Sequence, residues 1–275
     1  MLYGNKPADG GYLTVEPDEI DLFNNDLVRP YLKKMIGARE LIHNIPRYCL
    51  WLIDAPKEVL HDTNITKRIE KVKNFRLSSP KKATQLDAMT PHLFQEIRLR
   101  VLPRTSIVVP RHSSENREYI PMGFVNSDYV IGDSATFIPN GTLYDFAILE
   151  SRLHMTWMRT VCGRLESRYR YSRDLCYNTF PWPTVSEKQR ELISNLAQRI
   201  LDIREFYPEK TLADLYDPGE MPEELRNAHK ELDSAVERLY RKRPFETDEQ
   251  RLKHLFARYL KLINGQDPSD LFSGD

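Results

Sequence analysis

Apolar residues in the first ninety positions follow two different periods. A helical period runs from about Glu16 to Ile36 and stops near Gly37, and another runs from Ile65 to Leu77 with lysines on its opposite side. Between them, residues 47–53 form the short apolar and aromatic run RYCLWLI, which is closed by Asp54–Pro56. This part of the chain therefore predicts two helices separated by a buried strand.

The pattern changes between Leu93 and Pro139. Short β-branched or aromatic runs are separated there by turn residues, and residues 97–101 alternate between apolar and charged side chains. This spacing predicts a meandering or mixed sheet. Helical spacing returns from Leu143 to about Arg164, with Leu149, Leu153 and Trp157 on one stripe.

Three amphipathic helices are predicted after Pro183. Their starts carry residues typical of helix N-termini, at Ser186, Pro222 and Thr247. Their apolar stripes favour a small helical bundle. We therefore predict an α+β fold, with a mixed or antiparallel sheet and helices in a domain over residues 1–183, a helical C-terminal domain over 184–264 and a disordered tail over 265–275.

The composition is that of an ordinary globular protein. The chain has 275 residues, of which 40% are hydrophobic and 29% charged. No apolar run approaches the roughly 20 residues that cross a bilayer, and the first residues do not form a secretory signal. Three widely spaced cysteines argue against a disulfide framework or a zinc site and favour a reducing, cytoplasmic location.

The net charge of zero conceals an uneven distribution. Residues 1–183 carry 25 Lys and Arg against 21 Asp and Glu, whereas residues 184–275 carry 15 against 19. Residues 67–104 alone contain ten basic and three acidic residues. Such local excesses could form a positive face for nucleic acid, or they could be two solvated surfaces.

The most informative stretch is residues 152–183. Its first part, to Arg173, holds six arginines and a single acid, Glu166, with tyrosine and tryptophan between them. Arginine beside aromatic residues suits a surface that meets phosphates and base edges, because the guanidinium is a planar fork of donors that stacks well. If the segment is extended, Glu166, Arg168 and Arg170 share one face.

The sequence offers little catalytic apparatus. Phosphate loops, HExxH, CxxC and GxSxG motifs are absent, as are the [DNS]PP[YFW] motif of amino-methyltransferases and the PD…ExK cluster of metal-dependent nucleases. His154 and Cys162 are eight residues apart on a predicted helix, which is too far for a direct hydrogen bond. We expect no metal site and interpret the cysteine as a buried free thiol.

Several segments together resemble the C-terminal part of the MmeI-like enzymes, which are single-chain restriction–modification proteins that methylate adenine N6. The resemblance runs from the first residues to about Ile263, in blocks that occur in the family's order. These blocks are GNKPADGG at 4–11, RYCLWL at 47–52, SSENRxYIPxGF at 113–124, WMRxVCGRL at 157–165, YRYS at 169–172, YNxFPWP at 177–183 and LYDPGxMP at 215–222.

The resemblance implies a function for the chain. In that family this region is the target recognition domain followed by a helical segment, while the nuclease and the S-adenosylmethionine-binding methylase lie upstream. The chain would then be a fragment with an artificial start at Met1, without a cofactor of its own. Its partners would be double-stranded DNA and the upstream domains, with no membrane, and its role would be to choose the sequence in which an adenine is flipped and methylated.

The resemblance also implies which side chains read bases. Three pairs correspond to the family's base-reading positions: Glu166 with Arg168, Arg111 with Asp133, and Ser134 with Arg170. Arginine can bind O6 and N7 of guanine and a carboxylate can accept from N4 of cytosine, so one such pair can read a G·C pair. As plain surface salt bridges the same pairs would contribute only about 0–1 kcal/mol. Arg159, Arg164 and Arg173 are assigned to the DNA backbone or to structure.

Two other functions remain open at this point. The chain could be a self-sufficient enzyme with an unrecognised site, or a scaffold whose helical end binds protein partners. Salt-dependent binding to duplex DNA would favour the recognition module. Activity without an added methylase would favour the enzyme, and a stable protein complex through residues 186–263 would favour the scaffold.

Overall fold

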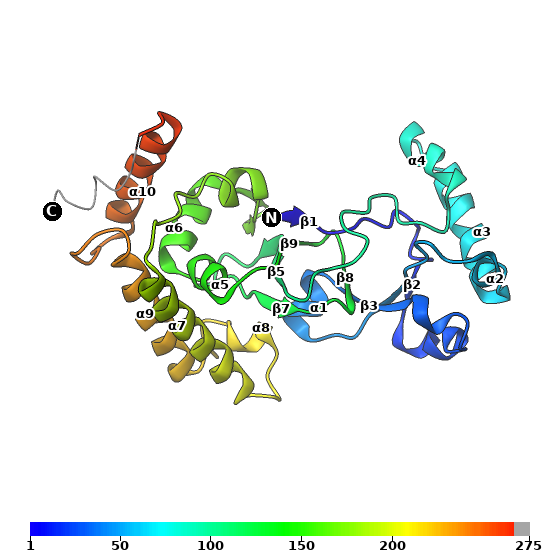
Figure 1. Ribbon diagram of the computed structural model, residues 1–275, viewed down its shortest axis with the longest axis horizontal. Coiled ribbons are helices and arrows are strands. Elements are labelled where there is room, and N and C mark those ends of the chain that lie inside the picture. The colour runs from blue at the N-terminus through cyan, green and yellow to red at the C-terminus, as the bar shows by residue number, and fades with distance from the viewer. Residues whose placement is uncertain (267–275) are drawn as a thin grey trace. The chain divides into compact units, whose positions relative to one another are not determined.

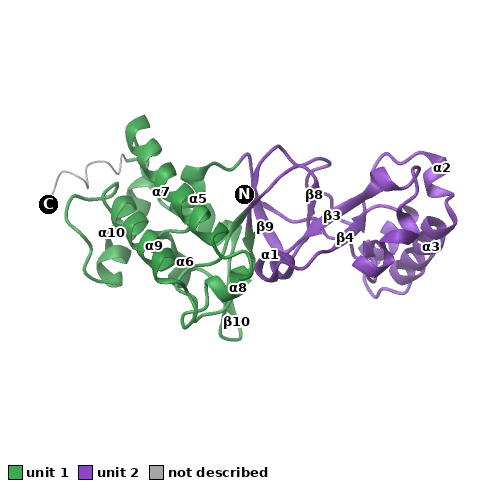
Figure 2. Ribbon diagram, turned by 90° about the horizontal axis from the view of Figure 1, so that it is seen from below, with its two compact units in different colours: residues 1, 109–123, 141–275 green, residues 2–108, 124–140 purple. Residues whose placement is uncertain are grey.

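The structure, a computed structural model, describes residues 1–266 as two compact units (Figure 2). Within the described residues, unit 1 comprises residues 1, 109–123 and 141–266, and unit 2 comprises residues 2–108 and 124–140. The tail predicted over 265–275 lies outside the described residues from position 267 onward. Among the described residues no helix is long and apolar enough to span a bilayer.

Two four-stranded sheets lie mainly in unit 2, so the predicted mixed sheet is confirmed. One has the order β2-β4-β3-β8, in which β3 pairs antiparallel with β4 and parallel with β8. The other has the order β1-β9-β5-β7. The strands are β1 (Leu2–Tyr3), β2 (Thr14–Val15), β3 (Leu32–Ile36), β4 (Tyr48–Leu50), β5 (Ser106–Pro110), β7 (Gly123–Val125), β8 (Tyr129–Ile131) and β9 (Ala135–Pro139).

The helix predicted over 16–36 is wrong. The 3₁₀ helices η1 (Pro17–Phe23) and η2 (Arg29–Tyr31) lead instead into strand β3. Pro30, in η2, interrupts a continuous helix, and β3 is held by partners on both sides that are remote in sequence. The strand predicted at 47–53 is confirmed as β4, whereas residues 97–101 form no strand.

Short helices complete unit 2, and the predicted helix 65–77 is confirmed as the longest of them. They are α1 (Ala38–His43), α2 (Lys57–Leu60), α3 (Thr63–Leu77), α4 (Lys82–Leu86) and the 3₁₀ turn η3 (Asp87–Met89). The Asp62 carboxylate caps α3 by accepting from the amides of Asn64 and Ile65. Arg76, within the basic stretch, is fully buried and donates to five backbone carbonyls, so it takes no part in a positive face.

In unit 1 the helices that precede the hairpin pack against the helices of the C-terminal region (Figure 1). Helix α7 packs on α5 and α9, and α10 packs on α6. The predicted caps Ser186 and Thr247 are confirmed, since each hydroxyl accepts from the amide three residues on. The helices are α5 (Leu143–Leu149), α6 (Arg152–Val161), the π-turn η4 (Arg173–Tyr177), α7 (Glu187–Glu205), α8 (Leu212–Leu215), α9 (Glu223–Glu237) and α10 (Asp248–Ile263).

The helix predicted over 143–164 is divided in two at Glu150 and Ser151. Ser151 caps α6 by accepting from the His154 amide, which starts a new helix. Glu150 is fully buried and accepts from the Met122 amide at 2.9 Å. The predicted apolar stripe survives the break, because Leu149, Leu153 and Trp157 are all buried. The break places the Glu150 carboxylate in the core of unit 1, and Glu150 and Ser151 are both buried there.

Candidate nucleic-acid interface

An exposed two-stranded hairpin follows α6 in unit 1. Strands β10 (Gly163–Leu165) and β11 (Arg168–Arg170) pair antiparallel, and Glu166 and Ser167 form the loop. A third strand, β6 (His112–Ser113), pairs with the other edge of β11. Most of the hairpin is exposed, but Tyr169 is buried and fixes it to unit 1.

One face of this hairpin is basic. Arg168 and Arg170 are two residues apart on β11 and point to the same side, opposite Tyr169. In the ladder Arg170 lies between Gly163 and His112. The sheet therefore presents two arginines and a histidine together, with no side chain at Gly163 to crowd Arg170.

Glu166 does not share this face as part of an extended run. It occupies the first loop position with φ of 57°, in the left-handed region. Its Oε2 nevertheless accepts from Nη2 of Arg168 at 2.9 Å, across side chains that are 74% and 57% exposed. An ion pair this exposed contributes about 0–1 kcal/mol, so its two ends can separate at little cost when another partner is offered.

The backbone conformation of Glu166 is unfavourable for a residue that carries a side chain. A left-handed conformation costs a residue with a Cβ about 1–2 kcal/mol, and glycine is preferred at such hairpin positions. Strain of this kind is often retained where a side chain has a function.

We expect the variant E166G to be more stable than E166A by about 0.5–1 kcal/mol. Both variants lose the carboxylate, so their difference isolates the backbone term at φ of 57°. Urea unfolding of the two variants measures it. Equal stabilities would mean that the loop relaxes away from the left-handed conformation.

Three of the predicted DNA-binding arginines act on one residue, His112. Burial lowers the pKa of His112, and the positive charges of Arg111, Arg170 and Arg168 lower it further. The backbone oxygen of Arg111 accepts from the Tyr171 amide at 2.8 Å, which holds Arg111 beside β11. His112 was missed by the sequence analysis, although its position next to Arg111 was a usable signal. The His112 imidazole is thus close enough to three arginines for their charges to act on it.

The other pairs are divided between the two units. Arg111 and Arg170 belong to unit 1, while their expected partners Asp133 and Ser134 belong to unit 2, in the turn between β8 and β9. Ser134 is exposed, and its hydroxyl accepts from the Ala38 amide at 2.9 Å. Only the first pair, Glu166 with Arg168, lies within one unit.

The arginines assigned to the DNA backbone make different contacts. Arg159 donates to the backbone oxygens of Arg117 and Glu118, which gives its guanidinium a structural role. Arg164 lies over the Tyr169 ring at 4.5 Å and donates to the Ser167 carbonyl. Arg173 pairs with Asp174 at 2.9 Å. Arg164 is exposed and Arg173 is partly so, which leaves both able to reach a phosphate.

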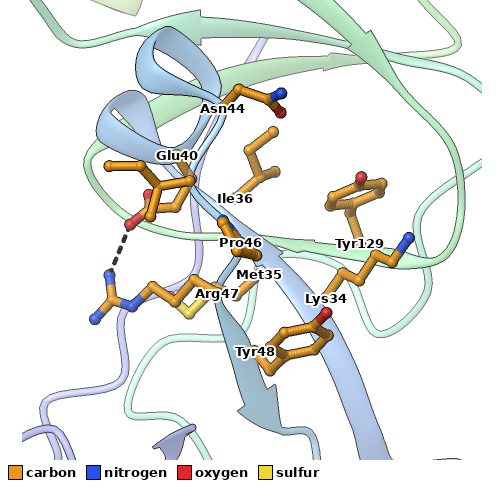
Figure 3. Close-up of a pocket in the computed structure, with 10 residues that line it drawn as sticks. Lys34, Met35, Ile36, Glu40, Asn44, Pro46, Arg47, Tyr48 and Tyr129 are labelled. Carbon is orange, nitrogen blue, oxygen red and sulfur yellow. Dashed lines mark hydrogen bonds and ion pairs between the residues drawn. The ribbon is translucent and has the colours of Figure 1, made fainter. Parts of the chain in front are cut away.

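A small cavity in unit 2 is distinct from the hairpin (Figure 3). Its volume is about 190 Å³, and Lys34, Arg47 and Tyr129 are among its lining residues. Arg47 is paired there with Glu40 at 3.3 Å. The cavity is smaller than the roughly 300–1,000 Å³ of ordinary ligand sites, so it does not fit a nucleoside-sized cofactor. Among the described residues no cluster of three or more His, Cys, Asp or Glu could hold a metal ion.

Comparisons with known proteins cover almost the whole chain. The family model for the MmeI target recognition domain matches residues 1–184, and that for the MmeI C-terminal domain matches residues 185–265. DNA methyltransferase A of Bacillus subtilis (strain 168) is 44% identical over 266 residues, which are 95% of this chain and 30% of that protein. A solved structure of the Type IIL restriction–modification enzyme MmeI in complex with DNA is 40% identical, with a TM-score of 0.91, and the match covers 96% of this chain and 35% of that one. The chain spans about a third of the length of these relatives.

Proposed function

This chain belongs to the MmeI family of target recognition and C-terminal domains, and we propose that it selects the DNA sequence on which a longer adenine-N6 methyltransferase acts. The methylase domain, with its S-adenosylmethionine, and a possible nuclease would be other parts of the same polypeptide. The share of the relatives that the chain spans is consistent with such additional domains. This recognition would take place in the cytoplasm, on double-stranded DNA.

The observation that carries the proposal is the exposed hairpin with its basic face. The major groove of B-DNA admits a two-stranded β-ribbon, and β10 with β11 is such a ribbon. Arg168 and Arg170 point from one face of it, and the carboxylate of Glu166 is held at its tip. With this face in the groove, the three side chains would meet base edges, while the buried Tyr169 on the opposite face holds the ribbon to unit 1.

The pair Glu166 and Arg168 would then read one G·C base pair. The guanidinium would donate to O6 and N7 of guanine, and the carboxylate would accept from N4 of cytosine. Their mutual contact in the absence of DNA keeps both charges partnered, and opening it costs little because both are exposed. A wrong base pair would leave a desolvated charge without a partner, which is the source of discrimination.

The resemblance also gives roles to the remaining predicted residues. Arg111 with Asp133 and Ser134 with Arg170 would read neighbouring base pairs. Arg164 and Arg173 would contact phosphates, which fix the register of the ribbon without reading sequence. The positive charges of Arg111, Arg170 and Arg168, which add to the effect of burial in lowering the pKa of His112, would also attract the DNA backbone.

Selection from a randomised duplex library tests the proposal with the chain as it is. We expect one sequence to be enriched. In the variant R168A the preference for one base pair over the others should fall about 5- to 150-fold at a single position, which corresponds to about 1–3 kcal/mol. The matched control is R199A, because Arg199 is similarly exposed and is paired with Glu231, also exposed, on the helices of unit 1. No enriched sequence, or equal behaviour of R168A and R199A, would contradict base reading by this hairpin.

A further inference from the structure

One apolar side chain lies on the basic face of the hairpin. Leu165, at the end of β10, is the register partner of Arg168 on β11. Residues directly opposite each other in an antiparallel ladder carry their side chains on the same side of the sheet, with Cβ atoms about 4.5–5.5 Å apart. Leu165 is 49% exposed. A large apolar group therefore stands beside the Arg168 guanidinium and is open to solvent.

The contacts on the other face of the hairpin agree with this assignment of sides. Arg164 and Tyr169 are also register partners, and the Arg164 guanidinium lies 4.5 Å from the centre of the Tyr169 ring. Tyr169 is buried, so the residues that alternate with these two point away from unit 1. On β10 they are Gly163 and Leu165. Gly163 has no side chain, so Leu165 supplies the side chain that β10 contributes to the basic face.

An apolar side chain on a face that meets base edges suits one feature of duplex DNA. In the major groove thymine presents its C5 methyl group, whereas the other groups that distinguish the base pairs there are hydrogen-bond donors and acceptors. A leucine side chain neither donates nor accepts a hydrogen bond. Leu165 therefore cannot compete with Arg168 for guanine or with Glu166 for cytosine, and it gains free energy only where an apolar group covers it.

We propose that Leu165 reads the C5 methyl group of a thymine in the base pair directly beside the G·C pair that Glu166 and Arg168 read. Successive base pairs are about 3.4 Å apart along the duplex. Leu165 and Arg168 are separated by one strand spacing, about 4.7–4.9 Å. Two side chains at that separation fit two adjacent base pairs. This inference rests on the proposed function, because it needs the basic face to lie in the major groove.

The methyl contact adds a preference that is smaller than that of the arginine and is confined to its own base pair. Covering one methyl group changes the affinity about fourfold. The bidentate contact of an arginine with guanine changes it about 5- to 150-fold. Truncation of Leu165 should therefore weaken the choice at the adjacent base pair and leave the choice of G·C at the Arg168 position as it is.

Replacing thymine by deoxyuridine tests the proposal, because deoxyuridine lacks the C5 methyl group but keeps the O4 acceptor. Selection from a randomised duplex library with the wild type and R168A first locates the base pair that Arg168 reads. We expect thymine directly beside it, and about fourfold weaker binding of the full chain when deoxyuridine takes its place. In L165A the two duplexes should bind equally. L192A truncates a similarly exposed leucine on α7 and should keep the wild-type difference.

The outcomes separate this inference from the function on which it rests. If no sequence is enriched, recognition by the hairpin fails, and the reading of a methyl group fails with it. If the selected sequence depends on Arg168 but the wild type binds thymine and deoxyuridine equally, methyl reading alone is overturned. A thymine preference that L165A retains would overturn it too. The wild-type comparison needs no variant, and the comparison in L165A is a ratio within one protein, so a loss of stability in L165A cannot imitate the expected result.

The variant L165V adds a graded measurement. Valine is a better strand former than alanine, so the hairpin should fold, but its side chain is shorter than that of leucine. We expect its ratio of thymine to deoxyuridine affinity to lie between those of L165A and the wild type. A ratio in L165V equal to that of L165A, with a full difference in the wild type, agrees with a contact at the end of the leucine side chain. A ratio above that of the wild type would contradict the proposed reach.

Discussion

Exchanging the two charges at the hairpin tip, in the double variant E166K/R168D, is expected to change the preferred base pair at one position of the recognition sequence and leave the other positions as they are. The ion pair between the side chains is retained with reversed sign, so the hairpin should fold as before. The new carboxylate on β11 would accept from cytosine N4, and the new ammonium group at the tip would donate to guanine O6 and N7. Guanine and cytosine would therefore exchange strands at that position.

The measurement is a map of methylated adenines in cells that express the longer methyltransferase containing this chain. Each specific contact accounts for about 1–3 kcal/mol, so the original sequence should be disfavoured by about 5- to 150-fold or more. The single variant R168D is expected to lose methylation at the original sequence without gaining a new one, because two carboxylates then face each other. The double variant R199E/E231R, which reverses an exposed ion pair of unit 1, should leave the map unchanged. Methylation of the original sequence by E166K/R168D would exclude this pair from base reading.

Helices and their caps could be predicted from the sequence because their determinants are local. The capping residues Ser186 and Thr247 act on amides three positions away, and the apolar stripe of α3 recurs within one turn. Strand β3 could not be predicted in this way. Its partners β4 and β8 lie further along the chain, and pairing on both edges overrides the weak helical pattern of 16–36.

The sequence proposes which residues read bases, but it does not give their geometry. The resemblance identified Glu166 and Arg168, and the structure joins them in an exposed ion pair. The alternation of charged and other residues predicts that Glu166 lies on a strand. It cannot show that Glu166 is a loop residue in the left-handed conformation, because only a glycine would signal that conformation in the sequence. His112 was missed since its place opposite Arg170 is set by strand register. His154 on α6 contacts Cys176 in η4, and this contact is set by how the two elements pack rather than by spacing along the helix.

The helices that follow the recognition region are joined to it through a buried polar network in unit 1. Arg204 on α7 donates to Glu150 at 3.1 Å, to the Met122 carbonyl at 2.7 Å and to the Tyr216 hydroxyl at 2.8 Å. Glu150 lies at the break between α5 and α6, and α6 leads from there to the hairpin. Nearby, Asp233 of α9 accepts from the Arg152 amide at 2.6 Å. The C-terminal helices thus support α6, from whose end the hairpin starts.

Removing the centre of this network, in R204A, is expected to cost about 3–5 kcal/mol of unfolding free energy. Arg204 is 8% exposed and Glu150 is fully buried, so the variant leaves a carboxylate in the core without its cation. Urea unfolding at neutral pH measures the loss. The control R199A removes an exposed ion pair of unit 1 and should cost no more than about 1 kcal/mol.

The pH dependence of the same variant identifies Glu150 as the cause. Burial raises the pKa of Glu150 to about 7 even beside Arg204, which acts in the opposite direction. Because the folded pKa lies above the unfolded value, the contribution of Glu150 to stability is fully present below about pH 4.5 and is lost as the pH rises through the folded pKa. Without Arg204 this pKa rises further, so R204A should lose stability more steeply than the wild type between pH 5 and 8. The double variant E150Q/R204A cannot carry the buried charge and should recover part of the loss, with a flatter pH dependence. If R204A were no less stable than R199A, the polar network around Arg204 would not be what joins the C-terminal helices to α6.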